Sequence, residues 1–242
     1  MFNKKLVLSA FISSMIFHAT VEAQVAIGDE ARNACVKDEM IALTVKGAGL
    51  GAMAGLGSAL FGNKKEDALK KAAAGAAVGG AAGFATAYFT ANENCNKKNP
   101  SWIPESKLER TQGYEEVKAA TKYKPSEGIK VQATTLLMPN RATAGTNISV
   151  ESNFIVLTPN GEEMEVTIER KLFVIDNDGK ENALPYNGQK IETMTFQPGG
   201  NKDTGNIKIP EKTPVGTKFR YEFSVSAGGK PTSSVQGIVA IN

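Results

Sequence analysis

The chain has 242 residues, a formal net charge of +3 and one histidine, and its length leaves room for about two modest domains. The charge is close to neutral and no basic stripe is interleaved with aromatic residues, which argues against nucleic acid as a partner. His18 lies in the N-terminal segment that we expect to be removed. Without it the chain lacks the commonest general base and metal ligand, which argues against an enzyme. We assign no catalytic residue, no metal ligand and no cofactor.

Residues 1–23 have the features of a secretory signal peptide. Lys4 and Lys5 precede the apolar run Leu6–Phe17, and Ala23 ends a small-residue cleavage site. The apolar run is too short for a comfortable membrane span. Removal of these residues takes away two lysines and one glutamate, so the net charge falls from +3 to +2. No cysteine sits at the cleavage point, which disfavours a lipid anchor. We therefore expect an exported protein.

Residues 24–95 carry a regular glycine pattern with a charged break in the middle. Glycine recurs at every fourth residue in two sets, Gly47, Gly51 and Gly55 and then Gly75, Gly79 and Gly83. This spacing places small residues on one face of a helix, so that two helices can approach closely. In an antiparallel hairpin the numbers of facing residues have a constant sum. The pairs Gly47 with Gly83, Gly51 with Gly79, and Gly55 with Gly75 all add to 130.

The two cysteines of the chain follow the same rule. Cys35 and Cys95 also add to 130, so a hairpin that turns near Lys64–Glu66 brings them together at its open end. Two cysteines in an exported chain favour a disulfide over a metal site. We predict an antiparallel helical hairpin over residues 24–95, closed by a Cys35–Cys95 disulfide.

The hairpin must bury its apolar surface, and either a membrane or other protein can cover that surface. Ala72–Asn92 is uncharged and about 31 Å long as a helix, enough to cross a hydrocarbon core. Lysines in the intervening loop fit a cytoplasmic loop under the positive-inside rule. Alanine and glycine are only weakly hydrophobic, however, so helices packed against protein satisfy the same faces. Membrane association and packing within protein both remain open.

Residues 96–127 differ in composition and predict a linker with one possible short helix. Prolines bracket the segment, and a helix over about Glu105–Lys122 has few apolar positions. Trp102, the only tryptophan, has two interpretations: an anchor at a membrane interface, or a residue packed on a neighbouring element, which we favour.

Residues 128–242 alternate apolar and polar side chains. The clearest run is Phe219–Val225, and Pro159-Asn160-Gly161 is typical of a hairpin turn. About seven strands with short turns predict an antiparallel β-sandwich of immunoglobulin-like type. Asp176-Asn177-Asp178-Gly179 is interpreted as a turn and not a calcium loop, because no glutamate occupies the closing position.

The six glycines resemble the glycine-zipper hairpins of bacterial envelope proteins, over about Lys46–Phe89. Pro214-Val215-Gly216 before the Phe219–Val225 strand is similar to a strand entry of bacterial immunoglobulin-like domains. We therefore expect a multi-domain α plus all-β protein of the periplasm or cell envelope, in which a Gly/Ala-rich hairpin precedes the sandwich. The resemblance implies self-association through the hairpin, association with a membrane, and an envelope protein as partner. The alternative is a membrane-active protein whose hairpins form a pore.

Overall fold

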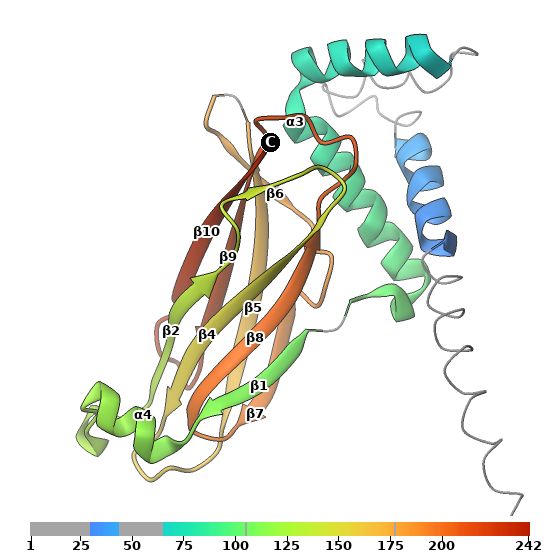
Figure 1. Cartoon of the computed structure of the whole chain (residues 1–242). Helices are drawn as coiled ribbons and strands as arrows, with labels where there is room; N and C mark the ends of the chain where they lie inside the picture. Colours follow the sequence, from blue (N-terminus) through green and yellow to red (C-terminus); the bar gives the residue numbers. More distant parts are fainter. Residues whose placement is uncertain (1–29, 44–64, 105, 177) are drawn as a thin grey trace, which may run out of the picture.

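The structure is a computed structural model that describes residues 30–43, 65–104, 106–176 and 178–242 (Figure 1). Residues 30–43 are helical, and two further α-helices follow, α3 (Lys65–Lys98) and α4 (Tyr114–Thr121). Two short 3-10 helices, η1 (Pro100–Trp102) and η2 (Pro125–Glu127), lie in the connections. The remainder is predominantly β, and its strands form two sheets.

The strands of the described residues are β1 (Lys107–Gln112), β2 (Lys130–Leu137), β3 (Arg141–Ala142), β4 (Asn147–Leu157), β5 (Met164–Ile175), β6 (Glu181–Leu184), β7 (Ile191–Phe196), β8 (Gly199–Lys208), β9 (Lys218–Ser226) and β10 (Ser233–Ile241). The first sheet has the order β1-β8-β4-β2 and is antiparallel throughout. The second has the order β3-β10-β9-β5-β6, with β3 and β10 parallel. The predicted antiparallel β-sandwich is confirmed in this form.

Strand β5 is the longest strand of the second sheet and has neighbours on both sides. It pairs with β9 along one side over Thr167–Ile175. On the other side it pairs with β7 along its first half and with β6 along its second half. Together β6 and β7 therefore form one long edge of this sheet, interrupted by the connection that joins them.

The core lies between the two sheets and follows the alternation of the strands. Val166, Ile168, Leu172 and Val174 of β5 are at most 1% exposed, and they meet the inward side chains of β4, β8 and β9. Phe154 contacts Phe223 and Phe196 in this layer. Period-two burial of apolar side chains is what the sequence pattern predicts for strands with one face in a core.

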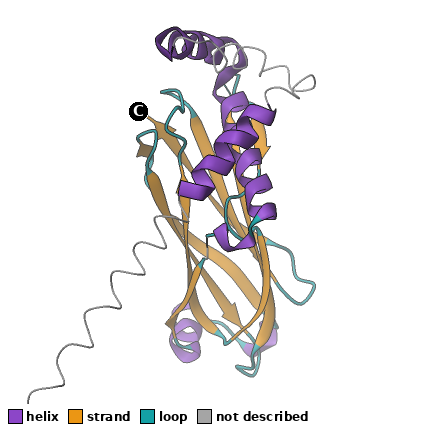
Figure 2. Cartoon of the chain, turned by 90° about the vertical axis from the view of Figure 1, so that its right-hand side faces the viewer, coloured by secondary structure: helices purple, strands orange, loops and turns teal. Residues whose placement is uncertain are grey.

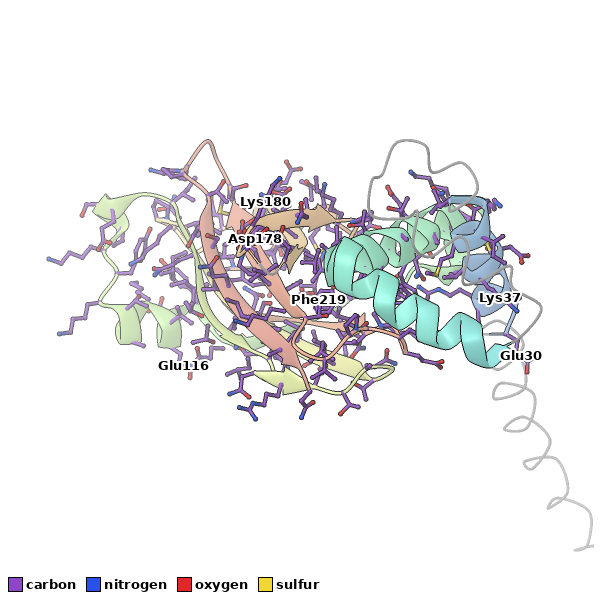
Figure 3. All side chains as sticks on the ribbon, turned by 90° about the horizontal axis from the view of Figure 1, so that it is seen from above. Glu30, Lys37, Glu116, Asp178, Lys180 and Phe219 are labelled. Carbon is purple, nitrogen blue, oxygen red and sulfur yellow. A yellow bond between two sulfur atoms is a disulfide. The ribbon has the colours of Figure 1, made fainter. Side chains whose placement is uncertain are left out.

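The second half of α3 belongs to the same core. Ala85 and Phe89 are at most 1% exposed and belong to the cluster of buried residues between the sheets. The ring of Phe89 lies 6.2 Å from that of Phe219 on β9. The first half of α3 leaves the sandwich at this end, whereas α4 lies at the other (Figures 1 and 2). In Figure 3, Lys37 and Glu116 accordingly mark opposite ends of the molecule. The apolar residues of α3 from Ala85 to Ala91 are therefore covered by protein.

The predicted membrane span and the predicted antiparallel hairpin can be compared with the described helices. Within the described residues no helix is long and apolar enough to cross a membrane. Segment 30–43 contacts α3 through Arg32 with Asn92, and through Glu39 with Asn94 and Lys98. The residue numbers of the partners on α3 therefore increase along segment 30–43, whereas they decrease along an antiparallel pair of helices. These contacts do not confirm the predicted antiparallel register, and Figure 2 shows the segment crossing α3 obliquely.

Two details of the sandwich differ from the prediction. Pro159-Asn160-Gly161 does form a turn, with Gly161 at φ 72°, but it joins β4 and β5, which belong to different sheets, so it is no hairpin. The segment interpreted as a linker contains β1, which pairs with β8, and the short helix α4. Strand β1 has one apolar side chain, Leu108, so alternation of hydrophobic residues does not reveal it.

Candidate functional site

The helices are fastened to the sandwich by a disulfide and by polar contacts. Cys35 and Cys95 form the predicted disulfide, and Val36, Ala91 and Cys95 pack together beneath Trp102. The position of Trp102 agrees with the interpretation that it packs on a neighbouring element. Side-chain amides extend the attachment to the β6–β7 connection, because Arg32 donates to Asn187 Oδ1 at 2.7 Å. Segment 30–43 is thereby held against both α3 and the sandwich.

The glycines of the predicted packing seam are only partly described. Gly47, Gly51 and Gly55 lie outside the described residues. Gly75, Gly79 and Gly83 all lie within α3, and Gly83 lies between Ala82 and Ala85, which pack in the core of the sandwich. Any contact between the two glycine sets therefore lies outside the described residues, and the seam remains a prediction.

A cleft of about 590 Å³ lies where the end of α3 and η1 meet the β6–β7 connection. Its walls combine apolar and charged residues: Glu93, Asn96, Lys97, Pro100 and Ile103 on the helical side, and Ala183, Leu184, Pro185, Tyr186, Gly188 and Lys190 on the sandwich side. Lys97 pairs with Glu93 at 3.1 Å. A concave site with an apolar lining and a few polar groups is the usual form of a binding site.

Asn96 is the most buried polar residue of this cleft, at 7% exposure. Its amide nitrogen donates to the carbonyl of Asn187 at 3.3 Å. Its Oδ1 atom accepts no hydrogen bond. A buried acceptor without a donor costs free energy, so the α3 wall of the cleft holds an unsatisfied polar atom.

Behind this cleft, a buried charged cluster joins the two sheets. Arg170 of β5 is fully buried and makes two hydrogen bonds to Asp203 of β8, at 2.8 and 2.9 Å. It also pairs with Glu192 of β7 at 2.7 Å and donates to the carbonyl of Gln189. Ser106, which precedes β1, bridges Arg170 and Glu192. One guanidinium thus holds β5, β7, β8 and the entry of β1 together.

Electrostatics keep the arginine of this cluster charged. Burial lowers the pKa of the Arg170 guanidinium, but its hydrogen bonds and charge pairing with Asp203 and Glu192 outweigh burial and raise the pKa above its usual value. Burial raises the pKa of the neighbouring Tyr186 to about 12. Burial likewise raises the pKa of Tyr221 well above its usual value. Both phenols therefore remain neutral beside an ion pair at physiological pH.

Tyr186 makes the stability of the fold sensitive to alkaline pH. Its pKa is raised in the folded state, so its contribution is fully present below pH 10 and is lost as the pH rises from about 10 towards 12. We expect the urea midpoint to fall across this interval, and to fall less steeply in Tyr186→Phe. Equilibrium unfolding at a series of pH values between 9 and 11.5 measures it. An identical pH dependence in the variant would contradict the assignment.

The remaining candidate for metal binding is a turn. Asp176 Oδ1 accepts hydrogen bonds from the backbone N–H groups of Asp178 and Lys180 at 3.1 and 2.8 Å, which closes the β5–β6 connection labelled in Figure 3. This arrangement agrees with the predicted turn. Within the described residues, no group of three or more histidine, cysteine, aspartate or glutamate side chains is placed to hold a metal ion.

Sequence reasoning missed the Arg170 cluster, although a feature of the pattern indicates it. Arg170 occupies the inward phase of β5, between Ile168 and Leu172. A charged residue in the apolar phase of a strand needs a buried partner. Asp203 occupies the corresponding inward phase of β8, but only the pairing of the sheets brings the two residues together.

Comparison with known proteins shows no family. No family model matches the chain, and no curated protein matches it. It resembles the CARDB domain of the PF1109 protein from Pyrococcus furiosus, with 14% identity and a TM-score of 0.33, covering 48% of this chain and 90% of that one. The sporulation control protein Spo0M from Bacillus subtilis gives 12% identity and a TM-score of 0.30, covering 46% of this chain and 49% of that one. This chain thus matches about half the length of Spo0M.

Proposed function

We propose that this chain is a non-enzymatic exported protein of the bacterial periplasm or cell envelope, which assembles through its glycine-zipper helices and binds a protein partner through its β-sandwich. The observation that carries the proposal is the division of α3. Its second half is anchored in the core by Ala85 and Phe89, whereas its glycine-rich first half leaves the sandwich (Figure 1). Ala72–Ala81 is uncharged, and an uncharged helix is ordinarily covered by another surface.

The disulfide supports export, because disulfides persist in oxidising compartments. The strand order supports the immunoglobulin-like type of sandwich. In the immunoglobulin fold one sheet contains strands A, B and E side by side and the other contains C, F and G. Strands β2, β4 and β8 have the neighbours of A, B and E, and β5, β9 and β10 have those of C, F and G. Strand β1 then takes the edge position beside E that strand D occupies in that fold.

The cleft beside β6 is the part of the sandwich that we propose for the partner. Its apolar residues offer contact area, and its lysines and Glu93 offer charge. Beside it, Ala183 on the edge strand β6 is exposed. An extended segment of a partner that lies along this end of the sandwich can place its side chains in the cleft.

Sedimentation velocity of the mature chain, from Gln24 onward, tests the assembly. We expect the wild type to self-associate and the double variant Gly51→Leu/Gly79→Leu to lose the larger species, because leucine separates closely packed helices. Gly113→Leu is the matched control, since an added Cβ at Gly113 meets no atom within 4 Å. A wild type that stays monomeric, both in buffer and with lipid vesicles, would overturn assembly through these helices.

The same variants distinguish the alternative function, in which oligomeric hairpins act on a membrane. If the wild type releases a dye from loaded vesicles and Gly51→Leu/Gly79→Leu does not, the assembly is a membrane-active one. If the wild type releases no dye but self-associates, the hairpin serves assembly alone.

A further inference from the structure

The free edge of β7 differs from the other sheet edges in the described part of the chain. The backbone N–H of Arg170 donates to the carbonyl of Lys190 at 2.8 Å. Since hydrogen bonding alternates along an antiparallel ladder, Ile191, Thr193 and Thr195 must direct their backbone groups away from β5. Gln189 reaches the carbonyl of Ile191 at 3.5 Å. Within the described residues, the outward backbone groups of Thr193 and Thr195 have no hydrogen-bond partner.

Native proteins protect sheet edges with charge, proline, bulges, short strands or a covering element, and the other edges described here have such features. Strand β1 carries Lys107, Glu109 and Arg110 and has a bulge. Strand β2 also has a bulge. Strand β3 has two residues, and β6 has four and is followed by a proline. Strand β3 pairs only with Ala240 and Ile241 of β10, and β2 lies against the start of β10, where the backbone N–H of Ala133 donates to Ser233 Oγ.

Strand β7 has little of this protection, since Lys190 lies before the strand and Pro198 lies two residues beyond its end. Its six residues, Ile-Glu-Thr-Met-Thr-Phe, pair with β5 without a bulge and contain no proline or lysine. Its single charge, Glu192, points inward and is neutralised by Arg170. Ile191 and Met194 remain 52% and 40% exposed. An unprotected edge with exposed apolar side chains is a template for pairing with another strand.

We infer that β7 pairs with β7 of a second copy of this chain, antiparallel and centred on Thr193. In this register the outward-directed residues face each other, Thr193 opposite Thr193 and Ile191 opposite Thr195 of the other copy. Glu192 faces Met194, so no like charges are opposed, whereas centring the pair on Glu192 would place two carboxylates opposite each other. The strand is thus complementary to itself under a two-fold axis. The surface is separate from the glycine-rich helices, so the inference does not rest on the proposed function.

Single cysteines on β7 test the pairing directly, since Cys35 and Cys95 are already joined and leave no free thiol. Opposed Thr193 residues would have Cα atoms about 5.5 Å apart, within disulfide range. The Thr195 residues would be offset by four positions, about 14 Å along the strand. In the Gly51→Leu/Gly79→Leu background, we expect oxidation or a short bismaleimide to link Thr193→Cys into a covalent dimer and to leave Thr195→Cys a monomer.

A charge introduced on the same edge provides a second, independent test of the pairing. Thr193→Lys is expected to shift the sedimenting species in that background from dimer to monomer, whereas Thr143→Lys, at an exposed position after β3, is not. Circular dichroism and the melting temperature show that each variant is folded. A folded Thr193→Cys protein that forms no covalent dimer would overturn the inference, and so would equal cross-linking at 193 and 195. If β7 pairs only with another protein, Thr193→Cys forms no covalent dimer.

Discussion

Replacing Asp203 with asparagine is expected to lower the free energy of unfolding by about 3–5 kcal/mol, because it removes one partner of a buried ion pair and leaves the other charge in place. Arg170 and Asp203 are 0% and 1% exposed, so water does not replace the lost carboxylate. Urea unfolding followed by circular dichroism measures the change. Glu109→Gln is the control: Glu109 lies on the edge strand β1 and pairs with Lys107 of the same strand and with Lys202 of β8, and we expect little change for such a surface pair.

The matched double replacement separates the charge from the packing. Arg170→Met/Asp203→Leu removes both charges and keeps apolar volume, so we expect it to recover most of the stability that Asp203→Asn loses. Glu192 then has no cation in the core, but it is partly exposed and retains Ser106. A loss below about 1 kcal/mol in Asp203→Asn would show that the cluster does not hold the sheets together as described.

Breaking the disulfide by Cys35→Ser is expected to destabilise the attachment of the helices by about 4 kcal/mol, the loop-closure estimate for a separation of 60 residues. Opening the bond frees segment 30–43, which otherwise holds Asn92 and Asn187 through Arg32. Limited proteolysis measures the result as faster cleavage before Cys95. The wild type with reductant should behave like the variant. A variant that resists protease as the oxidised wild type does would contradict the expectation.

The sandwich could be predicted because most of its strands have one buried face. In β9, Phe219, Tyr221, Phe223 and Val225 alternate with polar residues, and all four are at most 1% exposed. The same periodicity marks β4 and β5. Strands β1 and β6 lie at edges and are short or polar, so their pattern carries little information. Their positions depend on the free edges of β8 and β5, which only the assembled sheets show.

The helical segment illustrates a different limit. A helix that is apolar on every side must be buried, and burial in protein is what the structure shows for Ala85 and Phe89. The sequence does not identify the covering surface, because alanine and glycine faces fit protein, lipid or another helix equally well. The cysteine pair was predictable from the residue numbers of the hairpin register, whereas the glycine contacts of that register involve residues 44–64, which lie outside the described residues.

The buried cluster was unpredictable for a related reason. An arginine in the apolar phase of β5 indicates that a partner exists, but a 33-residue separation from Asp203 hides which carboxylate it is. The pairing arises because β5 and β8 belong to opposite sheets and face each other across the core.

The burial of Phe89 against Phe219 also bears on how this sandwich could be reused in evolution. A strand sandwich that closes its own core is a portable module, which recombination can join to unrelated proteins. Here the ring that completes one end of the core comes from a helix 130 positions earlier in the chain, and an edge strand comes from the segment between them. A gene fragment that begins at residue 128 would lose both. The helices and the sandwich are therefore expected to be inherited as one unit.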